Sequence, residues 1–346
     1  MRLGRRVSHP DGKTGADIMA SEREFPPVLD GHEDFITALP AQKRDFLEES
    51  DRGHVDLPRA RRGGLGGAFV SIWLSNERAE QNAVGYAIQE LHDYLRICDR
   101  SDGQVRVVRT VAELDQALAE GAFAGILHFE GADPISYSLK ELRVFYEAGL
   151  RSLGLVWSRP TIFGYGVMFR GPQPTAGLTE AGFRLVEECG RLGILLDVSH
   201  LNPAGFWDLV RVIDRPFVAT HSCVKAISPH VRNLDDDQIK AIAEHDGTIG
   251  VTFANAFLRP DMDRHNDDTP LELVLAHFEH IINLVGDRHV SIGSDYDGTE
   301  VPRALKDAAH LPVLLRAFKH RGWSDDRLER ICYGNFRRVL AAVWRQ

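Results

Sequence analysis

Short apolar runs alternate with longer amphipathic segments along nearly the whole chain, and this alternation constrains the fold more than any other feature. A run of four to eight apolar residues predicts a buried strand, and the segments between the runs are long enough to form helices. Strands that alternate with helices are typical of a parallel sheet covered by helices. The eight runs are residues 28–31, 67–74, 125–129, 152–157, 194–198, 217–220, 248–253 and 290–294.

Several of the intervening segments begin after a residue that favours a helix N-terminus. Thr179 and Asp235 precede two of them, and Ser324 precedes the last. A side-chain oxygen at such a position accepts a hydrogen bond from a free backbone N–H group of the first helical turn. The expected helices are residues 77–97, 111–120, 139–148, 180–191, 203–212, 236–244, 271–285, 304–320 and 325–343.

The number and order of these elements predict one α/β domain, a (β/α)8 TIM barrel. Such barrels contain about 250 residues or more, and this chain has 346. A doubly wound open sheet is the competing fold, but its glycine-rich phosphate loop follows a strand. Residues 63–67 are glycine-rich but precede a strand, so we interpret them as a flexible turn. We expect the barrel to occupy residues 25–346, after a polar, poorly ordered leader at residues 1–24 in which Met19 is an alternative start.

Charge and composition exclude several classes of partner. The 41 basic residues are outnumbered by 50 acidic ones, which gives a net charge of −9 and argues against nucleic acid as a partner. No window approaches the roughly 18 uninterrupted apolar residues that a membrane helix requires. The four cysteines form no Cys-x-x-Cys pair, which fits a reducing compartment. We therefore expect a cytoplasmic protein that binds neither nucleic acid nor membranes.

Titratable residues stand at the C-terminal ends of five predicted strands, the end at which barrels carry their active sites. Residues two apart on a strand point the same way, so His32 and Asp34 are expected to face one spot. Each residue alone is more often a hydrogen-bonded loop residue or a turn former. Together, three imidazoles and three carboxylates suit zinc or a similar divalent ion. The six residues are His32, Asp34, Glu130, His200, His221 and Asp295.

Motifs spread over nearly the whole chain, from about Val28 to Leu340, resemble those of the renal (membrane) dipeptidase family of zinc peptidases, peptidase family M19, within the amidohydrolase-type barrels. The matching segments are residues 30–34, 56–59, 63–67, 130–131, 177–179, 197–200, 221–222, 232–236, 293–298 and 334–336.

This resemblance implies a site with two zinc ions per chain. Glu130 would bridge the ions, with His32 and Asp34 completing one site and His200 and His221 completing the other. A hydroxide held between the metals would attack the peptide carbonyl. The resemblance further implies that Asp295 is the acid/base group and that Arg232 binds the C-terminal carboxylate of a dipeptide. Members of the family are often homodimers, so a homodimer is possible here.

One position departs from the family pattern. The family usually has a histidine that binds substrate and stabilises the tetrahedral intermediate where this chain has Trp157. An indole keeps one N–H donor but cannot carry a positive charge or accept a proton. Either Trp157 itself donates to the substrate, or Arg159 or another group replaces the histidine, or the site takes a different substrate. We expect an active enzyme with shifted preference or lower turnover.

The prediction from the sequence is a zinc-dependent dipeptidase that acts on small dipeptides. No Gly-x-Ser-x-Gly elbow, phosphate loop or His-Glu-x-x-His motif suggests a rival chemistry. Two alternatives stay open: a metal-dependent hydrolase of another small amide, such as an N-acyl amino acid or a peptide conjugate, and a catalytically silent barrel that acts as a binding module.

Overall fold

The structure, a computed structural model, describes residues 24–345, so nearly all of the predicted leader lies outside the described residues. Eight strands follow one another around a sheet in the order β1-β2-β4-β5-β6-β7-β8-β9, and every adjacent pair is parallel. These strands are β1 (Val28–Glu33), β2 (Leu65–Ile72), β4 (Phe123–Glu130), β5 (Leu150–Gly154), β6 (Leu195–Asp197), β7 (Val218–Ser222), β8 (Thr248–Val251) and β9 (Val290–Ile292).

The sheet closes between its first and last strands. The backbone N–H of Asp34 donates to the carbonyl of Tyr296 at 2.9 Å, and the N–H of Asp295 donates to the carbonyl of His32 at 3.1 Å. Lower in the barrel, the N–H of Ser294 donates to the buried carboxylate of Asp30 at 2.7 Å. A closed parallel sheet with one helical layer outside it confirms the predicted (β/α)8 barrel.

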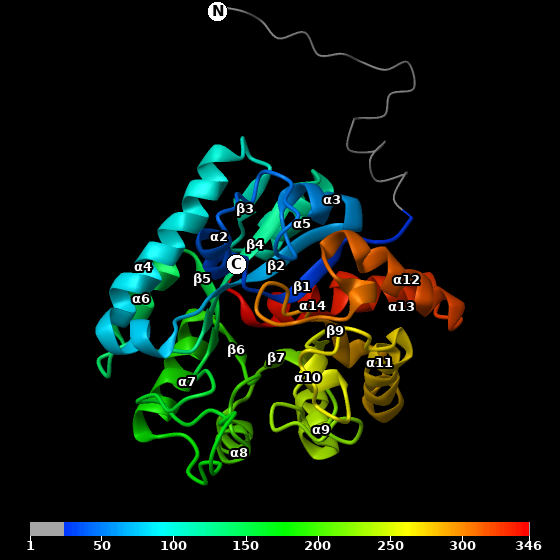
Figure 1. Ribbon diagram of the computed structural model, residues 1–346. Helices are drawn as coiled ribbons and strands as arrows, with labels where there is room; N and C mark the ends of the chain where they lie inside the picture. The colour runs from blue at the N-terminus through cyan, green and yellow to red at the C-terminus, as the bar shows by residue number, and fades with distance from the viewer. Residues whose placement is uncertain (1–23, 346) are drawn as a thin grey trace, which may run out of the picture.

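The helices surround the strands, with α4, α6 and α7 on one side of the view and α11 and α12 on the other (Figure 1). The three predicted N-caps form: Thr179, Asp235 and Ser324 each accept a hydrogen bond from the backbone N–H three residues later. The helices are α2 (Phe35–Gln42), α3 (Leu57–Gly63), α4 (Asn76–Arg100), α5 (Val111–Ala119), α6 (Lys140–Ala148), α7 (Glu180–Leu192), α8 (Pro203–Val212), α9 (Asp236–Glu244), α10 (Asn255–Leu258), α11 (Leu271–Val285), α12 (Leu311–His320), α13 (Asp325–Glu329) and α14 (Asn335–Val343).

Four elements were not expected from the sequence. The short strand β3 (Val105–Val107) pairs with the first residues of β4, an edge that is free because β5 pairs with β4 only from Leu127 onward. Helices α2, α3 and α10 lie in the connections that follow β1 and β8, and they are too short to show a clear apolar period.

Two predicted segments differ from the structure in detail. The expected helix at residues 304–320 begins as α12 only at Leu311, after two short 3-10 turns, and the last helix contains a π-helical stretch, Arg330–Gly334, between α13 and α14.

The interpretation of residues 63–67 as a flexible turn was wrong. Gly64 ends α3 with a φ of 74°, and Gly67 lies in β2, where a Cβ atom would come within 2.4 Å of the Ala124 carbonyl oxygen.

None of the helices within residues 24–345 combines the length and apolar character needed to cross a membrane.

Candidate metal centre

The carboxylate of Glu130, the last residue of β4, lies at the centre of the C-terminal end of the barrel. Its Oε1 atom is 2.8 Å from His200 Nε2 and 3.5 Å from His221 Nε2. Its Oε2 atom is 3.7 Å from His32 Nε2. The two oxygens therefore face different histidines, which is the arrangement expected of a carboxylate that bridges two ions.

His200 and His221 come from the ends of β6 and β7, and their Nε2 atoms are 3.0 Å apart. Each ring meets a hydroxyl on its other side, because His200 Nδ1 lies 2.8 Å from Ser158 Oγ and His221 Nδ1 lies 2.9 Å from Thr220 Oγ1. Such contacts fix the orientation of a histidine and leave Nε2 free for a metal ion.

His32 and Asp34 point to the same spot from the end of β1, as the strand period predicts. His32 Nε2 is 3.5 Å from Asp34 Oδ2, and it has no hydrogen-bond partner within residues 24–345 although it is fully buried. Asp295, at the end of β9, joins this group: His32, Asp34 and Asp295 offer ligand atoms that all lie within 4.8 Å of one another, as do His32, Glu130 and His221.

The carboxylate of Asp197, the last residue of β6, binds the hydroxyl groups that lie next to His221. It accepts hydrogen bonds from the Thr220 hydroxyl at 2.7 Å and the Ser199 hydroxyl at 2.7 Å. Because the Thr220 hydroxyl donates to Asp197, its oxygen accepts from His221 Nδ1–H, and this fixes the tautomer of His221. His128 closes the group, with Nε2 3.5 Å from Asp197 Oδ2 and Nδ1 2.9 Å from Ser152 Oγ.

Sequence reasoning missed Asp197, Ser158 and Thr220 as supporting groups. Asp197 lies three residues before His200 and could have been found by that spacing, but the contacts of Ser158 with His200 and of Thr220 with Asp197 depend on how neighbouring strands are placed.

The electrostatics of the cluster suit metal ligands. Burial lowers the pKa of His200 and of His221 well below the usual histidine value, so both imidazoles are neutral and can ligate. Burial acts to lower the pKa of His32 as well, but the carboxylates of Asp34 and Glu130 raise it above its usual value. Burial raises the pKa of Glu130 to about 7, and burial together with Asp34 raises the pKa of Asp295. Burying several carboxylates this close together costs free energy unless a cation is held among them.

The loop that carries Asp295 is tightly constrained. Asp295 has a φ of 63°, and a Cβ atom on Gly298 would come within 2.0 Å of Asp34 Oδ2 and 2.5 Å of Asp295 Oδ1. Asp297 points elsewhere, because its carboxylate accepts hydrogen bonds from the backbone N–H of His54 at 2.7 Å and from the Arg44 side chain. Asp295 therefore belongs to the cluster, whereas Asp297 stabilises the loop through His54 and Arg44.

Arg232 is buried beside the cluster in the connection after β7. Its Nη2 donates to the His221 carbonyl at 2.9 Å, and its guanidinium lies 5.3 Å from the centre of the Phe257 ring. Its Nε has no partner within the part of the chain that the structure describes. Burial lowers the pKa of Arg232 to about 10, so the group stays cationic at neutral pH.

Trp157 lies at the mouth of the barrel, with its ring centre 5.7 Å from that of His200. Arg159, which the sequence offered as a substitute for the family histidine, forms a bidentate ion pair with Asp133 at 3.0 Å for both contacts. Of the two side chains, the indole is the one packed against a ligand candidate.

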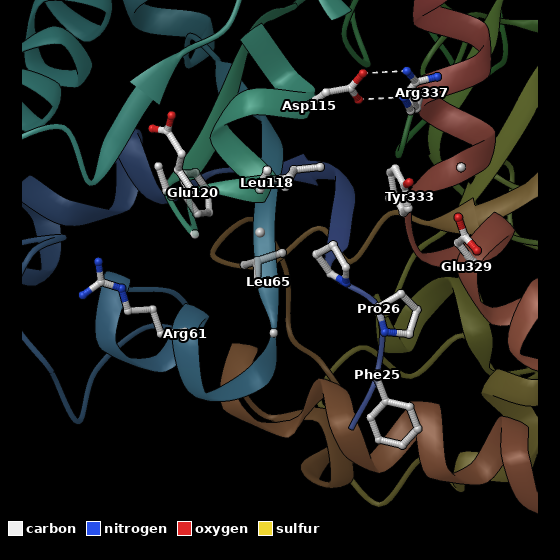
Figure 2. A pocket seen from close by; sticks show the side chains of 18 of the residues that line it. Phe25, Pro26, Arg61, Leu65, Asp115, Leu118, Glu120, Glu329, Tyr333 and Arg337 are labelled. Atoms are coloured by element: carbon white, nitrogen blue, oxygen red, sulfur yellow. Dashed lines mark hydrogen bonds and ion pairs between the residues drawn. The ribbon is translucent and has the colours of Figure 1, made fainter. Parts of the chain in front are cut away.

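A hollow of about 1390 Å³ lies at the opposite end of the barrel, where β2 begins at Leu65 and β4 begins at Phe123. Figure 2 shows that Phe25, Pro26 and Leu65 line it and that Asp115 and Arg337 are paired with each other across its edge. It holds none of the clustered imidazoles, so we assign the candidate site to the C-terminal end.

A parallel barrel with imidazoles and carboxylates gathered at the C-terminal ends of its strands defines a metal-dependent hydrolase of the barrel type. The model of the membrane dipeptidase family, peptidase family M19, matches residues 20–345. The chain belongs to this family of metallopeptidases, and it is a dipeptide-hydrolysing enzyme.

Two solved structures and a curated relative are similar to this chain. A metallo peptidase from Rhodobacter sphaeroides, liganded with a phosphinate mimic of the dipeptide L-Ala-D-Ala, is 39% identical with a TM-score of 0.88, over 93% of this chain and 100% of that one. Dipeptidase AC is 41% identical with a TM-score of 0.88, over 93% of this chain and 99% of that one. Dipeptidase 3 of Homo sapiens is 28% identical over 92% of this chain and 65% of its own length.

The homodimer and the cytoplasmic location that the sequence suggested stay predictions.

Proposed function

We propose that the enzyme is a zinc-dependent dipeptidase that binds two zinc ions per chain and hydrolyses the peptide bond of small dipeptides with a free C-terminal carboxylate. The observation that carries the proposal is the position of Glu130, whose two oxygens face His32 on one side and His200 and His221 on the other. The Rhodobacter sphaeroides relative, bound to a mimic of L-Ala-D-Ala, supports a dipeptide as the substrate.

The residues present fit zinc. Neutral imidazoles and carboxylates are its usual ligands when no cysteine is available. His32 Nε2 is buried without a partner among the described residues, and His200 Nε2 and His221 Nε2 converge on Glu130 Oε1. In this proposal Glu130 would be a ligand of both ions, His32 and Asp34 would complete one ion site, and His200 and His221 would complete the other.

Zinc bound here would supply Lewis-acid polarisation of the scissile carbonyl and a hydroxide nucleophile at neutral pH. The chain's own groups do the rest. Asp295 stands beside Asp34 at the end of β9, where it can take the proton of the attacking water and pass it to the leaving amine. Arg232 offers a buried guanidinium to the substrate carboxylate, an anion that matches its planar fork.

Trp157 takes the position of the family histidine and can donate only its indole N–H. We infer that it contributes to substrate binding without supplying a proton or a charge to the transition state. Replacing Trp157 by His should change the rate or the substrate range; an unchanged rate and range would contradict this role.

Metal analysis and a dipeptide panel test the proposal. We expect about two zinc ions per chain and hydrolysis that a chelator abolishes and added zinc restores. The panel should carry L and D residues at the second position. A purified chain without bound metal would contradict the metal centre. Zinc without dipeptide hydrolysis would favour the alternative substrate class, another small amide such as an N-acyl amino acid or peptide conjugate.

A further inference from the structure

Three aromatic side chains line one side of the barrel mouth; we name Trp73, Trp157 and Phe169 the aromatic wall. Trp73 directly follows β2, Trp157 follows β5, and Phe169 lies in the connection between β5 and α7. The ring centres of Trp73 and Trp157 are 5.3 Å apart, and those of Trp157 and Phe169 are 5.7 Å apart, both pairs meeting edge to face. Phe169 is 46% exposed, and both tryptophans are partly exposed.

The aromatic wall is held in place from behind. A Cβ atom on Gly166 would lie 1.8 Å from the Trp157 carbonyl oxygen, so the backbone at Trp157 is packed without free space. The Arg159 guanidinium, fixed by its ion pair with Asp133, lies 5.4 Å from the Trp157 ring centre. The backbone N–H of Trp73 donates to the buried carboxylate of Glu90 at 3.1 Å. Surfaces that are ordered before binding lose little entropy on binding.

Trp73, at one end of the aromatic wall, and Arg232 follow strands on opposite sides of the barrel, whereas the ring centre of Phe169, at the other end, is 6.1 Å from that of His230 in the connection that carries Arg232. Trp73 follows β2 and Arg232 follows β7. Between these strands stand β4, β5 and β6 in one direction and β8, β9 and β1 in the other. His200, whose ring centre is 5.7 Å from Trp157 and 5.0 Å from His221, lies between the two sides.

These positions orient a dipeptide. With its C-terminal carboxylate at Arg232 and its scissile carbonyl at the ligand cluster, as proposed above, it would extend its N-terminal residue toward β2 and β5. We propose that the aromatic wall binds the side chain of the N-terminal residue and selects dipeptides in which that side chain is apolar, above all aromatic or branched. This inference rests on the proposed dipeptidase function and on the role proposed there for Arg232.

The chemistry of the aromatic wall favours apolar groups. Edge-to-face indoles present both ring faces and ring edges, to which another aromatic ring or an aliphatic chain can pack. The Arg159 guanidinium, 5.4 Å from the Trp157 ring centre, is paired with Asp133 and is therefore not free to pair with an acidic substrate side chain. A glycine or alanine at the N-terminal position would leave the rings uncovered.

The test compares dipeptides that differ only in the N-terminal residue. The zinc-loaded enzyme is assayed with Gly-Ala, Leu-Ala, Phe-Ala and Glu-Ala, each made with L- and D-Ala. We expect kcat/KM to be about tenfold or more higher for Leu-Ala and Phe-Ala than for Gly-Ala and Glu-Ala. In Trp73→Ala, kcat/KM for Phe-Ala should fall about tenfold, mainly through KM, while that for Gly-Ala changes less than about twofold.

Controls separate recognition from folding. Trp73→Phe should keep most of the preference, and Phe183→Ala, on the outer face of α7, should keep all of it. Zinc content and thermal unfolding should be the same in Trp73→Ala and wild type. With the reversed dipeptide Ala-Phe, Trp73→Ala should behave as wild type.

The outcomes distinguish the two proposals. A wild-type enzyme that cleaves all four dipeptides at similar kcat/KM, or a Trp73→Ala variant that loses Gly-Ala and Phe-Ala equally, would overturn the inference and leave the dipeptidase function standing. Failure to cleave any dipeptide would contradict the proposed function and the inference with it.

Discussion

His200 Nε2 and His221 Nε2 lie 3.0 Å apart, and both face the same oxygen of Glu130. The two histidines come from adjacent strands, and each is held from behind by a hydroxyl. When each ring carries its proton on Nδ1, the two Nε2 lone pairs face each other, and a cation that both nitrogens bind stabilises this arrangement.

Replacing Asp34 by Ala should remove one of two zinc ions and abolish hydrolysis. Without the Asp34 carboxylate, only His32 and Glu130 are left to bind that ion. Zinc per chain, measured by mass spectrometry, should fall from about two to about one. Circular dichroism should show the barrel still folded. The matched control is Asp115→Ala, which breaks the ion pair with Arg337 at the opposite end of the barrel. A variant that keeps both ions would exclude Asp34 as a ligand.

Replacing Asp295 by Asn should lower kcat by about 100-fold to 10,000-fold without loss of zinc, because an amide cannot carry the proton from water to the leaving amine. Asparagine is the suitable substitution, since Asp295 has a φ of 63° and asparagine tolerates this left-handed conformation better than alanine. If kcat of the zinc-loaded variant stays near the wild-type value, Asp295 is not the acid/base group.

Replacing Thr220 by Val should weaken zinc binding by about 10-fold to 100-fold, because His221 loses the hydroxyl that fixes its tautomer. The affinity can be measured by competition with a chelator. Thr220→Ser keeps the hydroxyl and should bind zinc nearly as wild type does. Equal affinities for the Val and Ser variants would mean that the Thr220 hydroxyl does not position His221.

Glu90 on α4 should make stability depend on pH. Burial raises its pKa from 4.5 to about 8 in the folded protein. The folded state therefore binds the proton more tightly than the unfolded state. The contribution of Glu90 to the free energy of unfolding is therefore fully present below about pH 4.5, and it is lost as the pH rises toward about 8.

We expect Glu90→Gln to raise the melting temperature at pH 8 relative to wild type and to change it little at pH 4.5. Each pKa unit corresponds to about 1.4 kcal/mol, so the gain is of the order of a few kcal/mol at most, because Arg78 offsets part of the cost of the charged form. The melting temperatures of both proteins measured across this range give the result. A difference between them that does not change with pH would contradict the shifted pKa.

The alternation of apolar runs was enough to predict the barrel. All eight predicted strands are present, and the three predicted N-caps form. Local patterns succeed here because a strand buried on both faces must be apolar over its whole length. They miss β3, whose three residues pair with an edge of β4 that only the offset of β5 leaves free.

The residues of the candidate site could also be selected from the sequence, but their contacts could not. The rule that barrel chemistry stands at the C-terminal strand ends selected His32, Asp34, Glu130, His200, His221 and Asp295 from the sequence, and the structure brings these residues into one cluster. Their roles stay predictions.

The sequence by itself determined which residues stand at the strand ends, because that depends only on the order of strands and loops. The tertiary structure alone decided what lies behind and beside them. Asp197 on β6 accepts a hydrogen bond from Thr220 on β7, Asp297 binds the backbone of His54 instead of joining the cluster, and Trp73 packs edge to face against Trp157 on one side of the barrel mouth. These contacts join segments that are far apart in the sequence, and their geometry is set by the stagger and closure of the barrel, which no local pattern encodes.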